Sequence, residues 1–98
     1  MNGPQIRAHV HFLPADAGGR KTDTPTDRFG CIMEISGKNL DVSLMVGETG
    51  PVAPGNTVEI DIQFLDWESA RTVVDEGSAF TLRDFRRIGQ GVVLKSYV

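Results

Sequence analysis

The strict alternation of apolar and polar residues constrains the fold of this chain more than any other feature. It is clearest between Val58 and Phe64, where apolar side chains alternate with acidic or amide ones, and it also runs from Ile6 to Phe12. A period of two places successive side chains on opposite faces of a β-strand. Helical spacing of apolar residues is almost absent, so the sequence predicts an all-β fold.

Six segments show this pattern, and each has one apolar face. The expected strands cover residues 6–12, about 28–36, 40–46, 58–64, a short stretch around Phe80 and Leu82, and 88–97. Residues 36–39 supply a turn that joins the second and third strands into a hairpin. Six such strands predict a closed antiparallel β-barrel, because closure removes exposed sheet edges. Gly89 and Gly91 in the last strand indicate a bulge, a bend or a close backbone approach.

Length and charge limit the function classes. Residues 1–98 form a single expected domain, with 40% hydrophobic and 23% charged residues, which is ordinary for a globular protein. The formal net charge of -3 gives no broad positive field, so any contact with RNA would be local. No stretch resembles a cleaved leader or an apolar membrane span, and we expect a cytoplasmic protein with no membrane association.

The reactive residues favour no catalytic or metal site. Cys31 lies in an apolar strand and is expected to be a buried, reduced thiol. His9 and His11 share a strand face, but no third ligand accompanies them. The segment Gly18–Thr22 lacks the glycine spacing of a phosphate-binding loop. We therefore expect no enzyme activity, no cofactor, no metal and no nucleotide site.

Two segments are not assigned to strands. Residues 14–27 form a loop of a length that often marks a functional or mobile segment. Residues 66–77 fit either a short helical turn or an irregular strand, and these alternatives stay open. Within them, Trp67 fits a cap on the barrel as well as it fits a contact residue.

Positive charge concentrates near the closing hairpin, where Lys95 accompanies three arginines and the Arg20–Lys21 loop can add to it, while the preceding region is acidic. Such asymmetry can orient a partner, and the alternative is a solubilising surface of paired charges. Aromatic residues beside arginines are typical of protein interfaces. The candidate binding residues are Arg20, Lys21, Trp67, Arg83, Phe85, Arg86 and Arg87.

Several motifs resemble the third domain of elongation factor Tu, in the same order and over nearly the whole chain. They are an opening strand, a Gly-Gly-Arg loop, a Pro-Gly turn into the fourth strand, and a closing pair of strands with Glu-Gly and Gly-x-Gly-Val-Val. In this chain these motifs are Ile6–Val10, Gly18–Thr22, Ala53–Val58, Glu76–Arg83 and Gly89–Val93.

The resemblance implies a six-stranded barrel without catalytic activity. In the family this barrel packs against a GTPase domain, helps to hold aminoacyl-tRNA and contacts the nucleotide-exchange factor. The 98 residues leave no room for a GTPase domain, so we expect a free-standing barrel. The family's Glu-Gly-Gly turn is replaced here by Asp84, Phe85 and Arg86, and its loop histidine by Lys21. The expected function is a non-enzymatic module that binds a protein partner; the alternative is a local RNA- or tRNA-binding protein, and the oligomeric state stays open.

Overall fold

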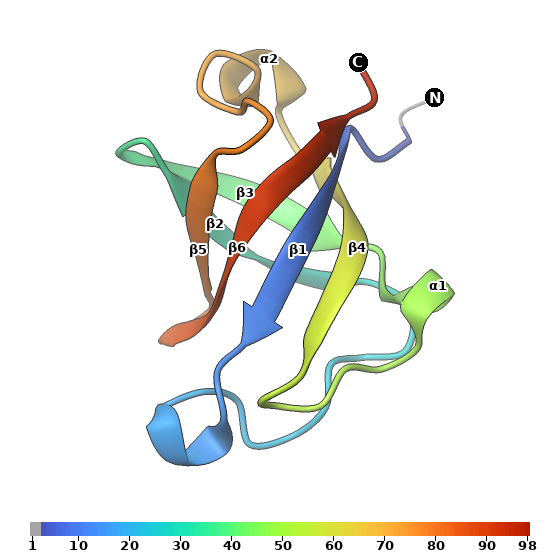
Figure 1. Cartoon of the computed structure of the whole chain (residues 1–98), viewed down its shortest axis with the longest axis vertical. Helices are drawn as coiled ribbons and strands as arrows, with labels where there is room; N and C mark the ends of the chain where they lie inside the picture. The colour runs from blue at the N-terminus through green and yellow to red at the C-terminus, as the bar shows by residue number, and fades with distance from the viewer. Residues whose placement is uncertain (1–2) are drawn as a thin grey trace.

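The computed structural model describes residues 3–98, in which six strands close into an antiparallel barrel in the order β1-β4-β3-β2-β5-β6 (Figure 1). The predicted fold class is therefore confirmed. The strands are β1 (Ile6–Phe12), β2 (Phe29–Ile35), β3 (Lys38–Leu44), β4 (Thr57–Phe64), β5 (Ala79–Arg83) and β6 (Arg87–Ser96). Three short helical segments lie between them: η1 (Ala15–Ala17), α1 (Val46–Thr49) and α2 (Trp67–Ala70).

Alternation along each strand builds the interior. Every second residue of β1, from Ile6 to Phe12, is buried, and β2 repeats the pattern from Phe29 to Ile35. Removing such apolar side chains from water is the main stabilising contribution to a small fold. The largest fully buried side chains are Ile6, Met33, Leu44, Ile60, Ile62, Leu82 and Ile88.

The strand β1 lies between β4 and β6, which brings the beginning and end of the described chain together. Ile6 pairs with Ile62 on one side and with Ser96 on the other. Just beyond the strands, the backbone N–H of Tyr97 donates to the carbonyl oxygen of Gln5 at 2.8 Å. Both ends therefore emerge at one end of the barrel, close to α2 (Figure 1).

The glycines of β6 allow β1 to approach closely. A Cβ at Gly89 would lie 2.8 Å from the carbonyl oxygen of His11, and one at Gly91 would clash with the carbonyl oxygen of His9. The register between these strands also shifts between Arg7 and Ala8. Of the three alternatives given for Gly89 and Gly91, the close backbone approach is therefore present, and the register shift lies farther along β6, beyond Val93.

The hairpin of β2 and β3 is confirmed, but its turn is shorter than predicted. Only Ser36 and Gly37 form the turn, because both have positive φ angles, 48° and 78°, which reverse the chain in two residues. Lys38 and Asn39, expected in the turn, therefore pair with Ile35 and Glu34.

The third strand also ends earlier than predicted, at Leu44 rather than Val46. Val46 begins α1, and its side chain is still fully buried. The apolar pattern continues past the end of β3 because α1 also places the side chain of Val46 in the core. Apolar alternation alone could not distinguish these two backbones.

The segment 66–77 takes the helical alternative at its start. Asp66 caps α2, and its Oδ1 accepts a hydrogen bond from the backbone N–H of Ser69 at 3.3 Å. Ala70 and Val74 turn into the core. No helix formed by residues 3–98 is long and apolar enough to cross a membrane.

The long loop 13–28 is fastened to the barrel at several points. The buried Thr24 exchanges two hydrogen bonds with Val52: its backbone N–H donates to the carbonyl at 3.0 Å, and its hydroxyl accepts from the Val52 N–H at 2.9 Å. Further along, the N–H of Gly47 donates to the carbonyl of Asp27 at 2.7 Å. The loop is thus held against α1 and the segment that follows it.

Candidate binding surface

The β5–β6 turn is built by Asp84. Its Oδ1 accepts hydrogen bonds from the backbone N–H groups of Phe85 and Arg86, and its own N–H donates to the carbonyl of Arg86 at 3.1 Å. The backbone N–H groups of Asp84, Phe85 and Arg86 therefore all find acceptors within the turn. Phe85 is fully exposed to solvent, and Arg86 and Arg87 are exposed beside it.

Arg20 holds the long loop against this turn. Its guanidinium carbon lies 4.5 Å from the ring centre of Phe29, and its Nη1 lies 3.7 Å from Oδ2 of Asp84. Its Nη2 also donates to the carbonyl of Asp23 at 3.3 Å. Because stacking and an ion pair occupy Arg20, it acts mainly as a structural link.

Between the loop and the turn lies a small hollow of about 280 Å³, lined by Gly19–Thr22 and Asp84–Arg86. Lys21 and Arg86 come to this hollow from segments that are far apart in the sequence. Within residues 3–98, neither of them nor Arg87 forms an ion pair. We call Lys21, Phe85, Arg86 and Arg87 the basic turn surface.

Arg83 is close in sequence but differs in environment. Its Nε lies 3.5 Å from Oε2 of Glu34 on the neighbouring strand β2. The pair is about 40% exposed, so it contributes little to stability, but it does neutralise the positive charge of Arg83. Lys95 is farther away: its Nζ lies 5.8 Å from the ring of Tyr97, beyond the other end of β6.

Trp67 does not belong to the basic turn surface. It begins α2, at the end of the barrel where the chain ends meet (Figure 1). Its half-buried ring packs on Phe64, with 5.4 Å between ring centres and 48° between the planes. Of the two roles considered for Trp67, this geometry is that of a barrel cap.

The two histidines lie on the outer face of β1. His9 is exposed, and Nδ1 of His11 lies 2.9 Å from the hydroxyl of Thr57. In the part of the chain that the structure describes, no three His, Cys, Asp or Glu side chains are grouped so that they could hold a metal ion.

Cys31 is buried on the inner face of β2, and its thiol is free. Burial and, to a smaller extent, the charge of Asp84 raise its pKa from 9.0 to about 12, against the opposing charge of Arg20. Since the thiolate is the reactive form, this cysteine is unreactive near neutral pH.

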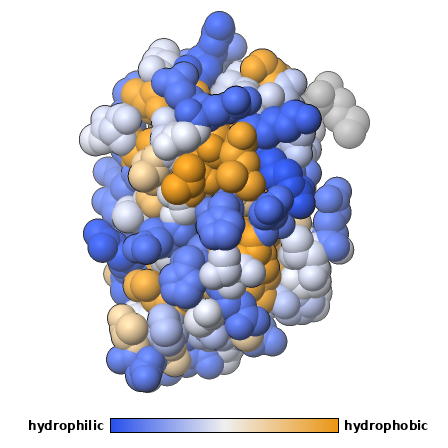
Figure 2. Space-filling view, in the orientation of Figure 1, coloured by the Kyte–Doolittle hydropathy of each residue, from blue (hydrophilic) through white to orange (hydrophobic). Residues whose placement is uncertain are grey.

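Apolar side chains also reach the surface along β6 (Figure 2). Val92 and Leu94 are about 40% exposed there, and Leu94 lies at the register shift opposite Arg7 and Ala8. Single exposed apolar residues are ordinary on protein surfaces, so we assign no site to them.

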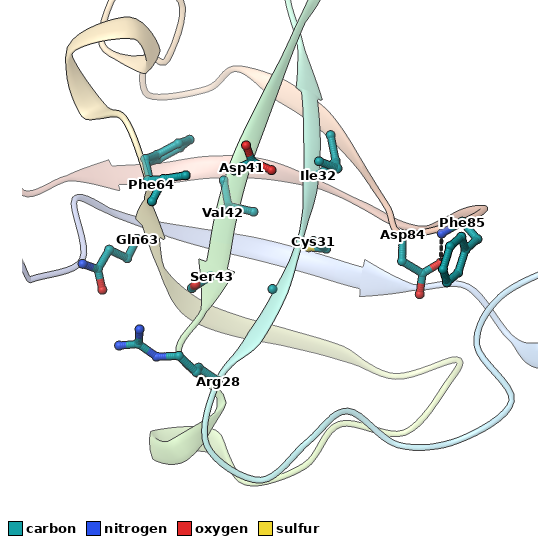
Figure 3. Close-up of a pocket in the computed structure, with 12 residues that line it drawn as sticks. Arg28, Cys31, Ile32, Asp41, Val42, Ser43, Gln63, Phe64, Asp84 and Phe85 are labelled. Atoms are coloured by element: carbon teal, nitrogen blue, oxygen red, sulfur yellow. Dashed lines mark hydrogen bonds between the residues drawn. The ribbon is translucent and has the colours of Figure 1, made fainter.

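A larger groove, of about 620 Å³, crosses the outer face of β2, β3 and β4 (Figure 3). Gly30, Ser43 and Gln63 are cross-strand neighbours along its floor. Leu65 and Phe85, both strongly exposed, belong to its lining at the β4 and β5 sides. This groove was not predicted from the sequence; the available signal was Gly30, a glycine at an outward position of a strand.

Comparison with models of protein families found no matching family, and the search of curated proteins found no match. The similarity to the third domain of elongation factor Tu therefore stays a prediction. It depends on the ordered motifs in the sequence.

Proposed function

We propose that this protein is a non-enzymatic, cytoplasmic binding module that recognises a protein partner through the basic turn surface. The observation that carries the proposal is the exposure of Phe85 between cationic residues that have no ion pairs within residues 3–98. The turn that holds them is fixed by Asp84 and by the loop link through Arg20.

A partner that covers the basic turn surface would gain binding free energy from apolar burial and from charge pairing. Burying a phenylalanine side chain contributes about 1.5–3 kcal/mol, and aromatic and arginine residues dominate interface hot spots. A partner with an apolar pocket surrounded by carboxylates would cover Phe85 and pair with Arg86 and Arg87. Long-range attraction between the opposite charges would also raise the association rate.

RNA binding is the second candidate, in keeping with the resemblance to a tRNA-binding barrel. The same cations could neutralise phosphates, and an exposed aromatic ring such as Phe85 can stack on a base. We place this function second because the chain is acidic overall, with a formal net charge of -3.

The test is an affinity pull-down from the native cell extract, divided into nuclease-treated and untreated halves, with both proteins and RNAs identified. We expect a protein partner that survives nuclease and is lost with the double variant Arg86→Glu and Arg87→Glu. The matched control is Lys38→Glu with Arg71→Glu, which changes the net charge equally on exposed residues elsewhere.

The outcomes separate the two candidates. RNA recovered from the untreated half, with proteins lost after nuclease, would favour RNA binding; its affinity should then fall steeply with added salt. A partner retained equally by the double variant and by the control would show that the basic turn surface is not the interface.

A further inference from the structure

Gly30, in the interior of β2, has no structural reason to be glycine. Its φ is not positive, and β2 pairs with β3 without a register shift. A Cβ at this position would meet no atom closer than the carbonyl oxygen of Val42, at 4.0 Å. Glycine inside a strand costs about 0.5–1 kcal/mol relative to alanine, so this position loses stability without a gain in packing.

Gly89 and Gly91 of β6 provide the contrast, because there the neighbouring strand occupies the space of a side chain. In strands, glycine also marks places where a ligand or another backbone approaches closely. At Gly30 such an approach can come only from outside the barrel, where the groove of about 620 Å³ lies.

The floor of the groove is lined by small residues here. Gly30 has no side chain, and its cross-strand partner Ser43 has a small one. On the next row of the floor, Ile32 pairs with Asp41. The residues of β2 before Ile32 have no register partner on β5, because β5 ends at Arg83 and the chain turns at Asp84. The groove is therefore open beside Gly30 and Cys31.

Apolar side chains are available on both sides of the groove. Leu65, which follows β4, is 82% exposed, and Phe85, at the β5 side, is fully exposed. The two lie on opposite sides of the β2–β3 hairpin. An occupant that crosses the hairpin could cover both with apolar side chains of its own.

The charges of the groove have opposite signs. Arg28 and Asp41 both line it, and neither forms an ion pair within residues 3–98. Asp84 is already used by its own turn and by Arg20. One free cation and one free anion can give an occupant a fixed direction.

We propose that this groove binds an extended segment of a protein partner. The segment has apolar side chains at both ends, a carboxylate that pairs with Arg28 and a cationic side chain that pairs with Asp41. Crossing from β4 to the β5 side covers about three strand spacings, roughly 15 Å, which corresponds to about five extended residues. This assignment rests on the proposed function, since it names a part of the same partner.

The test uses a displayed library of random short peptides, selected on the purified protein, with affinities then measured by fluorescence polarisation. We expect enriched peptides that combine apolar residues with one acid and one base. Gly30→Phe fills the groove and should weaken their binding at least about tenfold. Ala79→Phe, on an exposed position of β5 outside the groove, should leave it unchanged.

Two further measurements test whether weaker binding comes from the filled groove and not from misfolding. The melting temperature of Gly30→Phe should equal or exceed that of the parent, because aromatic residues suit strands better than glycine does. If this variant fails to fold, Arg28→Glu combined with Asp41→Arg keeps the net charge and should also weaken binding at least about tenfold.

Peptides that bind Gly30→Phe and the charge-exchanged variant as tightly as the parent would overturn the proposal, as would a selection that enriches no peptide. If Gly30→Phe instead abolishes self-association of the protein in the ultracentrifuge, the occupant is a second copy and the partner segment is wrong. Loss of the pulled-down partner through Arg86→Glu and Arg87→Glu, without any selected peptide, would retain the proposed function and reject only the groove.

Discussion

The side-chain oxygen of Gln5 accepts a hydrogen bond of 2.8 Å from the backbone N–H of Phe64, at the last residue of β4. Gln5 is buried, and its own backbone N–H donates to the carbonyl of Ile62 at 3.1 Å. The side chain of Gln5 thus extends the β1–β4 hydrogen-bond ladder at the residue just before β1 begins. A buried polar residue that satisfies a buried N–H stabilises the barrel at this end.

We predict that Gln5→Leu destabilises the protein by about 1–3 kcal/mol, because it leaves the N–H of Phe64 buried without an acceptor. The free energy of unfolding in urea measures the effect. Gln90→Leu, on an exposed position of β6, is the control and should change stability by less than about 0.5 kcal/mol. Equal effects of the two variants would contradict the role given to Gln5.

Thr24 should be as important to the long loop as Gln5 is to the barrel end. Thr24→Val keeps the shape but removes the acceptor for the Val52 N–H, and we expect a loss of about 1–3 kcal/mol. Hydrogen exchange at the Val52 amide should become faster. Thr24→Ser retains the hydroxyl, so the Val52 amide should stay protected from exchange in this variant. Fast exchange in Thr24→Ser as well would show that the hydroxyl does not protect the Val52 amide.

The two strand glycines, Gly30 and Gly91, should respond oppositely to alanine. In Gly91→Ala the new Cβ would clash with the carbonyl oxygen of His9 and lie 2.7 Å from Cζ of Phe80, so we expect a loss of about 1–3 kcal/mol. Gly30→Ala meets open space and should gain roughly 0.5 kcal/mol. Melting temperatures of the two variants decide the matter, and a destabilised Gly30→Ala would mean that this glycine serves the fold.

Cys31 should make stability depend on pH in alkaline solution. Its folded pKa of about 12 lies above the ordinary 9.0, so the unfolded chain loses the thiol proton first as the pH rises. The stabilisation is complete below about pH 9, and between pH 9 and 12 the free energy of unfolding should fall by about 1.4 kcal/mol per pH unit from this group.

Cys31→Ala removes this contribution but leaves the other alkaline titrations in place. The difference in slope between the parent and Cys31→Ala, measured by urea unfolding at several pH values, isolates the thiol. Identical slopes would mean that the thiol ionises equally in both states.

Alternation in the sequence predicted the strands and the core faces well, since burial on one side of a strand requires it. The segment 57–64 shows why: its apolar residues Ile60, Ile62 and Phe64 are the ones that turn inward. The order of strands around the barrel depends on contacts between distant segments, such as β1 with β4, which no local pattern reports.

Local errors had local causes. Ser36 adopts a positive φ that the residue type rarely takes, so the two-residue turn could not be read from composition. Val46 is buried in a helix as it would have been in a strand. Gln5 is a polar residue that serves the interior, and its role depends on the end of β4, far away in the sequence.

The candidate site was predictable only in part. The charges of Arg86 and Arg87 and the exposure of Phe85 follow from a polar turn between two strands. Arg20 contacts Phe29 and Asp84, while Lys21 has no ion pair with any residue from Gly3 to Val98; this difference depends on how the long loop folds back. The groove over Gly30 is formed by β2, β3 and β4 together, so it depends on contacts between segments that are distant in the sequence.

The hydrogen bond between the N–H of Tyr97 and the carbonyl of Gln5 holds the two ends of the described chain side by side. Gly3 and Val98 both lie at the α2 end of the barrel, away from the basic turn surface (Figure 1). A short linker between these positions, with the chain opened between Ser36 and Gly37, would give a permuted protein that retains all six strand pairings. The same geometry would allow the barrel to be inserted into a loop of a host protein with Phe85 and its neighbouring cations still facing solvent.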